Sequence, residues 1–172
     1  GSRGLGRQMA LAFANHGADV AIASRKMEQC EAVAKEIEAL GQRAFPFACH
    51  VGKWEQLDGL VEAVYAKFGR IDILVNNAGM SPLYESLDQM SEELFDKVIG
   101  VNLKGPFRLS ALVGKRMAAG DGGSIINISS TGSVTPSPHA EPYGAAKAGL
   151  NAITRSFAHA YAPKVRVNAI MA

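Results

Sequence analysis

The sequence predicts a doubly wound α/β fold, in which helices cover both faces of a parallel sheet. Strand-like and helix-like patterns alternate along the chain, and this alternation is typical of parallel βαβ units. The strand-like segments are continuous apolar runs, as expected of strands that are buried on both faces. With 172 residues, 48% of them hydrophobic, the chain is long enough for one core, and we expect residues 1–172 to form a single domain.

The expected elements follow one another in a regular order. Strand-like runs cover residues 19–24, 43–49, 71–76, 124–129 and 165–170, and helix-like patterns cover residues 9–16, 27–40, 54–68, 102–117 and 143–161. Another helix is expected to begin at Ser91, because serine can cap a helix and the acidic Glu92 and Glu93 favour its first turn. Gly41 and Gly69 stand where glycine commonly ends a helix. Residues 54–68 also carry one apolar helical stripe: Leu57, Leu60, Val61, Val64 and Phe68.

The chain opens with a glycine-rich segment directly before its first helix, Gly1-Ser2-Arg3-Gly4-Leu5-Gly6. Glycines at a strand-to-helix turn let the backbone approach a pyrophosphate, and the helix N-terminus offers free N–H groups and a positive dipole end. A glycine-rich opening also forms plain turns. The strand that should precede such a loop does not occur in this sequence.

The strand-like run at residues 19–24 ends in Ser24 and is followed by Arg25. Folds that select NAD usually place an acidic residue here, where it binds the ribose 2′-hydroxyl. A guanidinium instead suits a 2′-phosphate, and Arg3 adds a second positive charge. These residues favour NADP(H) over NAD(H). The alternative is that Arg25 is a solvated residue at the start of the next helix.

Tyr143 and Lys147 stand four residues apart at the start of an alanine-rich helical segment, so both side chains lie on one helix face. An ammonium group at that distance favours the ionised phenol. A tyrosine in this setting can exchange a proton with a substrate oxygen near neutral pH. An isolated pair of this kind is more often an ordinary surface pair, so the interpretation depends on the other motifs.

Composition argues against several classes of function. The net charge is +2 and the basic residues are scattered, which indicates no nucleic-acid partner and no membrane surface. No apolar run approaches the roughly 20 residues of a membrane span. Cys30 and Cys49 have no metal or redox spacing and are expected to be reduced thiols of a cytoplasmic protein. The histidines are dispersed, so no metal site is expected.

Six segments in this order resemble motifs of the short-chain dehydrogenase/reductase family of Rossmann-fold enzymes. Residues 1–6 resemble the second part of that family's Thr-Gly-x-x-x-Gly-x-Gly loop. The others are Asn76-Asn77-Ala78-Gly79, Val101-Asn102, Ile128-Ser129-Ser130, Tyr143 with Lys147, and Arg166-Val167-Asn168. Of the two adjacent serines, Ser130 has the family's spacing of 13 residues to the tyrosine (143 − 130), and Ser129 should point to the opposite face of the strand.

The resemblance implies an NAD(P)-dependent oxidoreductase that transfers a hydride between the nicotinamide and a ketone or secondary alcohol, such as a carbonyl reductase. It implies that Tyr143 is the general acid or base and that Lys147 stabilises the tyrosinate and binds the nicotinamide ribose. Ser130 would donate a hydrogen bond to the substrate oxygen, and Asn102 would anchor a water chain leading to Lys147. The expected cofactor contacts are Ser2, Arg3, Leu5, Gly6, Ser24, Arg25, His50, Val51, Asn77, Ala78, Gly79, Tyr143 and Lys147.

The sequence departs from the family pattern at His50, where the family often has an aspartate that contacts the adenine. We also expect the chain to be a portion of a longer protein, without its first strand and its C-terminal segment. The proline-rich residues 136–142 would form a stiff wall beside the substrate. The resemblance also implies a homo-oligomer, either a dimer or a tetramer, because the family's long helices often pack across a two-fold axis. An NADP-binding sensor without turnover is the alternative function, and the Asn-Asn-Ala-Gly motif disfavours an epimerase or dehydratase of nucleotide sugars.

Overall fold

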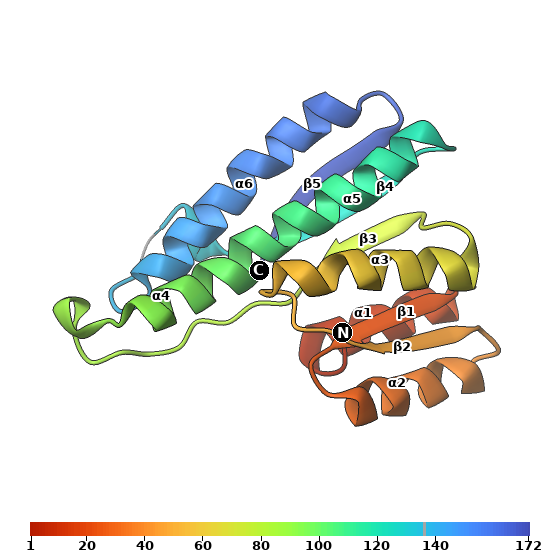
Figure 1. The fold of residues 1–172 in the computed structure, drawn as a ribbon, viewed down its shortest axis with the longest axis horizontal. Helices are drawn as coiled ribbons and strands as arrows, with labels where there is room; N and C mark the ends of the chain where they lie inside the picture. Colours follow the sequence, from red (N-terminus) through yellow and green to blue (C-terminus); the bar gives the residue numbers. More distant parts are fainter. Residues whose placement is uncertain (136) are drawn as a thin grey trace. The chain divides into compact units, whose positions relative to one another are not determined.

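The computed structural model describes residues 1–135 and 137–172, which form two compact units. The N-terminal unit comprises Gly1–His50 and Asp58–Arg70, and the C-terminal unit comprises Val51–Leu57 and Ile71–Ala172. The described strands all pair in parallel, β1 with β2 in one sheet and β3–β4–β5 in the other (Figure 1). The prediction of an α/β fold with parallel strands is confirmed. The organisation as a single domain stays a prediction.

The N-terminal unit contains α1 (Gly4–Asn15), β1 (Val20–Ser24), α2 (Met27–Ala39), β2 (Ala44–Ala48) and most of α3 (Trp54–Phe68). Helix α2 connects the two parallel strands as a βαβ unit and packs on both of them. The core consists of small and branched side chains: Ala10, Ala14, Ile22, Cys30, Val33, Ala34, Ile37 and Ala44. The amino group of Gly1 donates a hydrogen bond to the Ala23 carbonyl at 2.9 Å, so the glycine-rich segment lies beside the end of β1.

The C-terminal unit begins with β3 (Ile73–Asn76), followed by the short 3-10 helix η1 (Leu87–Gln89). Helix α4 (Glu92–Ile99), the π-helix η2 (Gly100–Lys104) and α5 (Gly105–Ala119) then follow one another without a break. After them come β4 (Gly123–Ser129), the 3-10 helix η3 (Thr131–Ser133), α6 (Glu141–Tyr161) and β5 (Val165–Met171). Strand β4 is central and pairs with β3 on one side and β5 on the other.

Helices α5 and α6 cover one face of this sheet, and a buried chain of polar side chains joins them to it. The Asn76 amide in β3 donates to Ser110 Oγ of α5 at 3.1 Å and to Asn127 Oδ1 of β4 at 2.8 Å. The Asn127 amide in turn donates to Thr154 Oγ1 of α6 at 2.9 Å. All four residues are buried, so their polar atoms depend on these hydrogen bonds.

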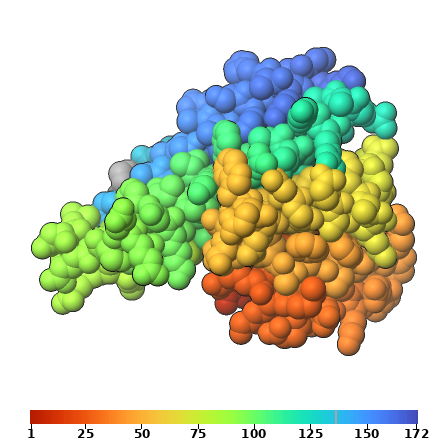
Figure 2. Space-filling model, viewed as in Figure 1, coloured from red at the N-terminus to blue at the C-terminus, as the bar shows by residue number. Residues whose placement is uncertain are grey.

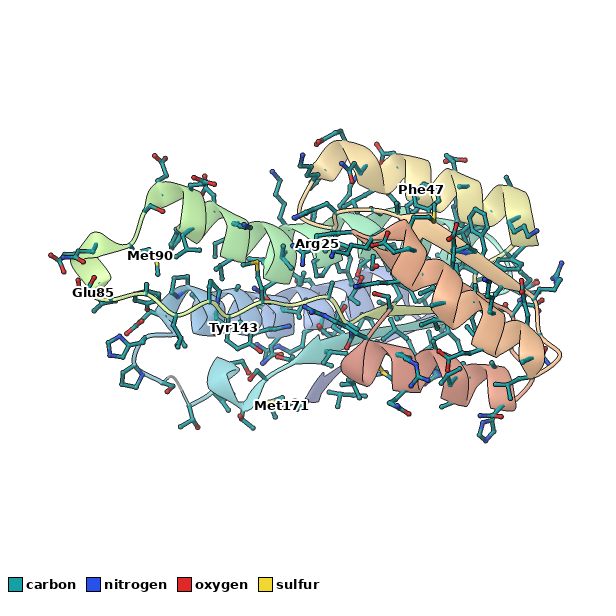
Figure 3. The ribbon with its side chains drawn as sticks, turned by 90° about the horizontal axis from the view of Figure 1, so that it is seen from below. Arg25, Phe47, Glu85, Met90, Tyr143 and Met171 are labelled. Atoms are coloured by element: carbon teal, nitrogen blue, oxygen red, sulfur yellow. The ribbon has the colours of Figure 1, made fainter. Side chains whose placement is uncertain are left out.

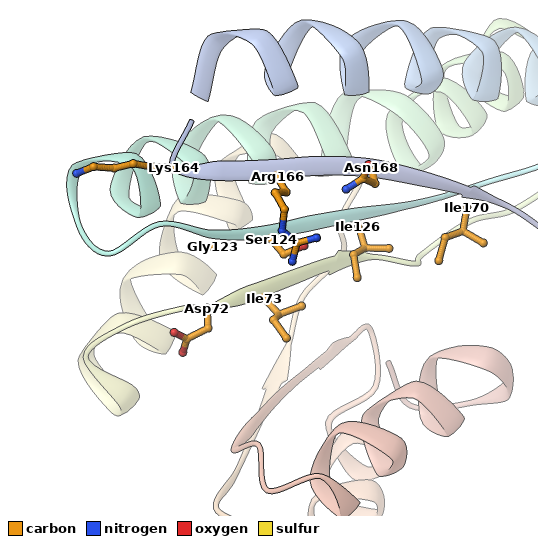
Figure 4. A pocket seen from close by; sticks show the side chains of 9 residues that line it. All are labelled: Asp72, Ile73, Gly123, Ser124, Ile126, Lys164, Arg166, Asn168 and Ile170. Atoms are coloured by element: carbon orange, nitrogen blue, oxygen red, sulfur yellow. The ribbon is translucent and has the colours of Figure 1, made fainter. Parts of the chain in front are cut away.

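The opposite face of the same sheet carries an open groove (Figure 4). Apolar and polar side chains line it together, among them Ile126 of β4 and Ile170, Arg166 and Asn168 of β5. These residues alternate with the inward-facing Ile125, Asn127 and Val167, as the period of a strand requires. The two faces of the C-terminal sheet therefore differ sharply in burial.

The predicted elements are found close to their expected ranges, with a few differences. Helix α1 begins at Gly4 rather than residue 9, and α6 begins at Glu141 rather than Tyr143. The predicted helix at residues 102–117 is split, because the π-helix η2 precedes α5. The short helices η1 and η3 were not predicted, since three residues are too few to show a periodic pattern.

One end of the C-terminal unit is formed by the segment that leads from β3 through η1 into α4, coloured green in Figure 2. Its Leu83 and Leu87 are among the most exposed apolar side chains, at 86% and 65%. Of the proline-rich stretch, residues 137–140 form an irregular turn with His139 in the left-handed region at φ 60°, and Pro136 lies outside the described residues.

Within residues 1–135 and 137–172, no helix has both the length and the apolar character needed to cross a membrane. The same residues contain no group of three or more histidine, cysteine, aspartate or glutamate side chains that could hold a metal ion.

Candidate active site

Ser130 directly follows β4, where the strand gives way to the turn of η3. Its backbone is extended, and its Oγ accepts a hydrogen bond from the Gly132 N–H at 3.2 Å. Ser129 is 3% exposed and buried, whereas Ser130 is half-buried, as expected of neighbours on opposite faces of a strand. Ser130, and not Ser129, is therefore accessible at the end of the sheet.

Tyr143 and Lys147 lie one turn apart near the start of α6, and Figure 3 labels Tyr143 on this helix. Lys147 Nζ lies 5.7 Å from the centre of the Tyr143 ring. The Lys147 side chain is buried, and its Nζ donates a hydrogen bond to the Ile128 carbonyl of β4 at 2.6 Å. Burial disfavours the charged form and lowers the pKa of Lys147 from 10.5 to about 8. The ammonium is thus kept beside the phenol by the end of β4.

Asn102 is fully buried in the π-helix η2. Its amide donates to the Val98 carbonyl at 2.9 Å and to the Met80 carbonyl at 2.8 Å, and its Oδ1 accepts from the Met80 N–H at 3.2 Å. In a regular α-helix the Val98 carbonyl would pair with the backbone N–H of residue 102. In the π-helix η2 the Asn102 side-chain amide donates to this carbonyl instead. Such π-helical turns often occur at functional sites.

Gly79 brings the segment after β3 next to both Asn102 and Lys147. A Cβ at this position would lie 3.1 Å from Asn102 Oδ1 and 3.7 Å from Lys147 Nζ. Gly132 has a similar position on the other side, where a Cβ would lie 3.6 Å from Ser130 Oγ and 3.9 Å from the Tyr143 ring. Asn102 and Lys147 therefore lie around Gly79, and Ser130 and Tyr143 lie around Gly132, all within the C-terminal unit.

The predicted phosphate-binding residues lie in the N-terminal unit. Ser2, Arg3, Leu5 and Gly6 are at the start of α1, and Arg3 caps this helix without a side-chain hydrogen bond. Ser2 Oγ donates to Gln29 in the first turn of α2 at 3.3 Å. Ser24 ends β1 beside Cys30, with its Oγ 3.1 Å from the Cys30 sulfur, and Arg25 is exposed. This places Ser2 and Ser24 beside the same end of α2.

The predicted adenine contacts, His50 and Val51, follow β2. His50 is half-buried and belongs to the N-terminal unit, while Val51 belongs to the C-terminal unit. The Val51 carbonyl packs so tightly on the start of α5 that a Cβ at Gly105 would lie 2.2 Å from its oxygen. Val51 is therefore held against the helix that follows Asn102.

Several residues of this site were not predicted from the sequence. They are Met80 and Ile128, which act through backbone atoms, and Ser133 and Asn151, which link α6 to the turn after Ser130. Backbone contacts leave no trace in residue type. Asn151, however, stands four residues after Lys147, and this spacing places it on the same face of α6.

The profile of the family described as short chain dehydrogenase matches residues 1–172. The chain belongs to the short-chain dehydrogenase family. Dehydrogenase/reductase SDR family member 4 of Homo sapiens is 34% identical over 168 residues, which are 97% of this chain and 60% of the human protein. The chain therefore spans about 60% of the length of this relative.

Two solved structures show the same fold as this chain. A metagenomic short-chain oxidoreductase in complex with NADP is 36% identical, with a TM-score of 0.94 over 99% of this chain and 77% of that one. An NAD⁺-bound xylitol dehydrogenase is 31% identical, with a TM-score of 0.91 over 99% of this chain and 65% of that one. The resemblance seen in the sequence is confirmed, and its structural neighbours include complexes with each of the two cofactors.

Proposed function

We propose that the protein is an NADP(H)-dependent oxidoreductase that transfers a hydride between the nicotinamide and a ketone or secondary alcohol. The observation that carries this proposal is the buried Lys147 ammonium, 5.7 Å from the centre of the Tyr143 ring and hydrogen-bonded to the end of β4. A buried amine is costly to keep without a function. Here it lies beside a tyrosine, and its hydrogen-bond acceptor, the Ile128 carbonyl, stands two residues before Ser130 in the chain.

The residues present fit a nicotinamide dinucleotide. No side chain caps the first turn of α1, so its backbone N–H groups can bind a phosphate. Gly79 leaves space beside Asn102 and Lys147 that any Cβ would fill. We propose that the cofactor contacts are Ser2, Arg3, Leu5, Gly6, Ser24, Arg25, His50, Val51, Asn77, Ala78, Gly79, Tyr143 and Lys147.

A bound nicotinamide supplies or accepts the hydride. In reduction, the Tyr143 hydroxyl donates its proton to the substrate oxygen, and in oxidation the phenolate accepts it. Lys147, with its pKa of about 8, is mostly protonated at neutral pH and attracts the negative charge on the tyrosine oxygen. Ser130 Oγ accepts from Gly132, which leaves its proton to be donated to the substrate oxygen.

We propose that Asn102 holds a water that relays protons toward Lys147. Few hydrogen-bonding positions of the Asn102 side chain are left for this water. Both hydrogens of its amide are donated to the carbonyls of Met80 and Val98. Its Oδ1 already accepts from the Met80 N–H. A water would therefore use the second lone pair of Oδ1, in the space that Gly79 leaves beside this oxygen.

The test is oxidation of NADPH and NADH by the full-length protein over a panel of carbonyl substrates. Tyr143→Phe should bind NADPH as tightly as the wild type and lose turnover by about 100-fold or more. A Tyr143→Phe variant that keeps most of its activity would contradict the mechanism. Tight NADPH binding by the wild type without turnover on any carbonyl would favour the sensor function instead.

The preference for NADP(H) rests on Ser24 and the exposed Arg25 at the end of β1. Because a charge-assisted hydrogen bond is worth roughly 1.5–3 kcal/mol, Arg25→Ala should lower kcat/KM with NADPH about 10- to 100-fold and leave NADH unchanged. Lys35→Ala, an exposed cation on α2, is the matched control. An equal loss with both cofactors would refute the preference.

We further propose that the protein forms a homo-oligomer, either a dimer or a tetramer, and that it is cytoplasmic. On α5, Phe107 is 41% exposed although it stacks on Trp54 and contacts Phe157 of α6 at a ring distance of 5.4 Å. Such an exposed aromatic is typical of a surface that packs against a second copy. The free thiols of Cys30 and Cys49 support a reducing compartment. Light scattering of the purified protein measures the oligomeric state.

A further inference from the structure

A chain of hydrogen bonds outside the four catalytic residues ends on the backbone of Ser130. The Asn151 amide on α6 donates to Ser133 Oγ in η3 at 2.8 Å. Ser133 Oγ–H in turn donates to the Ser130 carbonyl at 2.6 Å, and the Ser133 N–H donates to the same carbonyl at 3.0 Å. The Ser130 carbonyl is therefore held by two donors of one residue, and that residue is itself held by α6.

The direction of the Ser130 hydroxyl depends on this turn. Ser130 Oγ accepts from the Gly132 N–H, which lies between Ser130 and Ser133 in the chain. A hydroxyl carries one proton and two lone pairs, so this contact occupies a lone pair and leaves the proton available for the substrate oxygen. A donor on one side of a hydroxyl also strengthens the hydrogen bond that it donates. A shift of η3 would move the Gly132 N–H and turn the hydroxyl with it.

Helix α6 carries Tyr143 and Lys147 as well as Asn151. Tyr143, Lys147 and Asn151 stand four residues apart in succession, so they form one stripe on α6. A second contact presses η3 against the first turn of this helix, since a Cβ at Gly144 would lie 3.1 Å from the Gly132 carbonyl oxygen. The stripe that carries the tyrosine and the lysine therefore also fixes the turn that carries the serine.

We propose that Ser133 and Asn151 are positioning residues that fix the Ser130 hydroxyl relative to Tyr143. This inference rests on the proposed function, because it assigns their effect to the hydrogen bond that Ser130 donates to the substrate oxygen. It is distinct from a contribution to folding alone. A residue that acts only through Ser130 loses its effect on turnover once the Ser130 hydroxyl is gone.

The test is a double-mutant cycle in the full-length protein, with kcat, the KM for the carbonyl and the dissociation constant of NADPH measured for each variant. Ser133→Ala should lower kcat about 10-fold, since small misplacements of a catalytic group lower rates by one to two powers of ten, and should leave NADPH binding unchanged. In the Ser130→Ala background the same substitution should have almost no further effect. Ser133→Thr, which keeps the hydroxyl, should restore most of the rate.

Asn151→Asp keeps the shape of the side chain and removes the N–H that donates to Ser133, so it should lower kcat in the same way. Ser156→Ala, an exposed serine on α6, is the control and should leave kcat unchanged. An equal loss from Ser133→Ala with and without the Ser130 hydroxyl would overturn the inference and leave the proposed function standing. Wild-type turnover in Ser130→Ala alone would overturn both.

Discussion

Lys147 should make the stability of the protein depend on pH in the alkaline range, and Lys147→Met should remove that dependence. The side chain is 3% exposed, and a carbonyl oxygen, that of Ile128, accepts the hydrogen bond from its Nζ. One neutral acceptor replaces only part of the hydration that the ammonium has in the unfolded chain. For this reason burial lowers the pKa of Lys147 from 10.5 to about 8.

The sign and size of the effect follow from this difference in pKa. Above pH 10.5 the amine is neutral in both the folded and the unfolded state, so its burial carries no charge penalty. Below about pH 8 it is protonated in both states, and the folded state bears the full penalty. At roughly 1.4 kcal/mol for each pKa unit, the penalty is about 3 kcal/mol. The free energy of unfolding should fall by this amount as the pH falls from 10.5 to about 8, and then level off.

Urea unfolding of the wild type and of Lys147→Met, over the range from about pH 7 to about pH 11, measures this effect. The difference between the two curves isolates Lys147, because other groups that titrate in this range are present in both proteins. One of these is Cys49, whose thiol pKa is raised by burial. Lys115→Met, an exposed lysine on α5, should follow the wild type throughout. If the curves of the wild type and Lys147→Met run parallel, the argument from burial is wrong.

Three further substitutions test how packing and buried hydrogen bonds contribute to stability. Gly105→Ala would place a Cβ 2.2 Å from the Val51 backbone oxygen, so it should lower the free energy of unfolding by about 1–3 kcal/mol in urea denaturation. Gly59→Ala on α3, where a Cβ would meet nothing within 4 Å, should instead raise it by about 0.5–1 kcal/mol, and destabilisation of equal size by both would refute the steric argument. Asn127→Ala leaves the buried Asn76 amide without one acceptor and should cost about 1–3 kcal/mol by the same assay, whereas an unchanged stability would show that the polar chain is dispensable.

Much of the fold could be predicted because its signals are local. The strand at residues 165–170 and the helix at residues 54–68 were visible as an apolar run and an apolar stripe, and both occur within one residue of the predicted bounds. The pairing of Tyr143 with Lys147 was likewise a matter of spacing on one helix, and the structure brings the two side chains to a common face. Ser130 was chosen over Ser129 by the family's spacing to Tyr143, and the structure buries Ser129 and leaves Ser130 half-buried, as the alternation of strand residues between faces requires.

The contacts that define the site could not be predicted in this way. The π-helix around Asn102 forms where the side chain takes the Val98 carbonyl and binds both polar backbone atoms of Met80, 22 residues away in the chain. The Ile128 carbonyl that receives Lys147 is a backbone atom, and any residue type could supply it. No pattern in the sequence marks either partner.

The sequence by itself determined the class of fold and the order of helices and strands, because periodicity acts over a few residues. Its short motifs carry the family resemblance from which the residues of the proposed chemistry follow. Tertiary structure decided how buried Lys147 is, which backbone atoms hold it, and how Ser133 and Asn151 reach Ser130. These properties arise from groups that are far apart in the chain and meet only when β4 packs against α6. The packing of β4 against α6 removes Lys147 from water and thereby lowers its pKa. The same packing forms the hydrogen bonds that set the direction of the Ser130 hydroxyl.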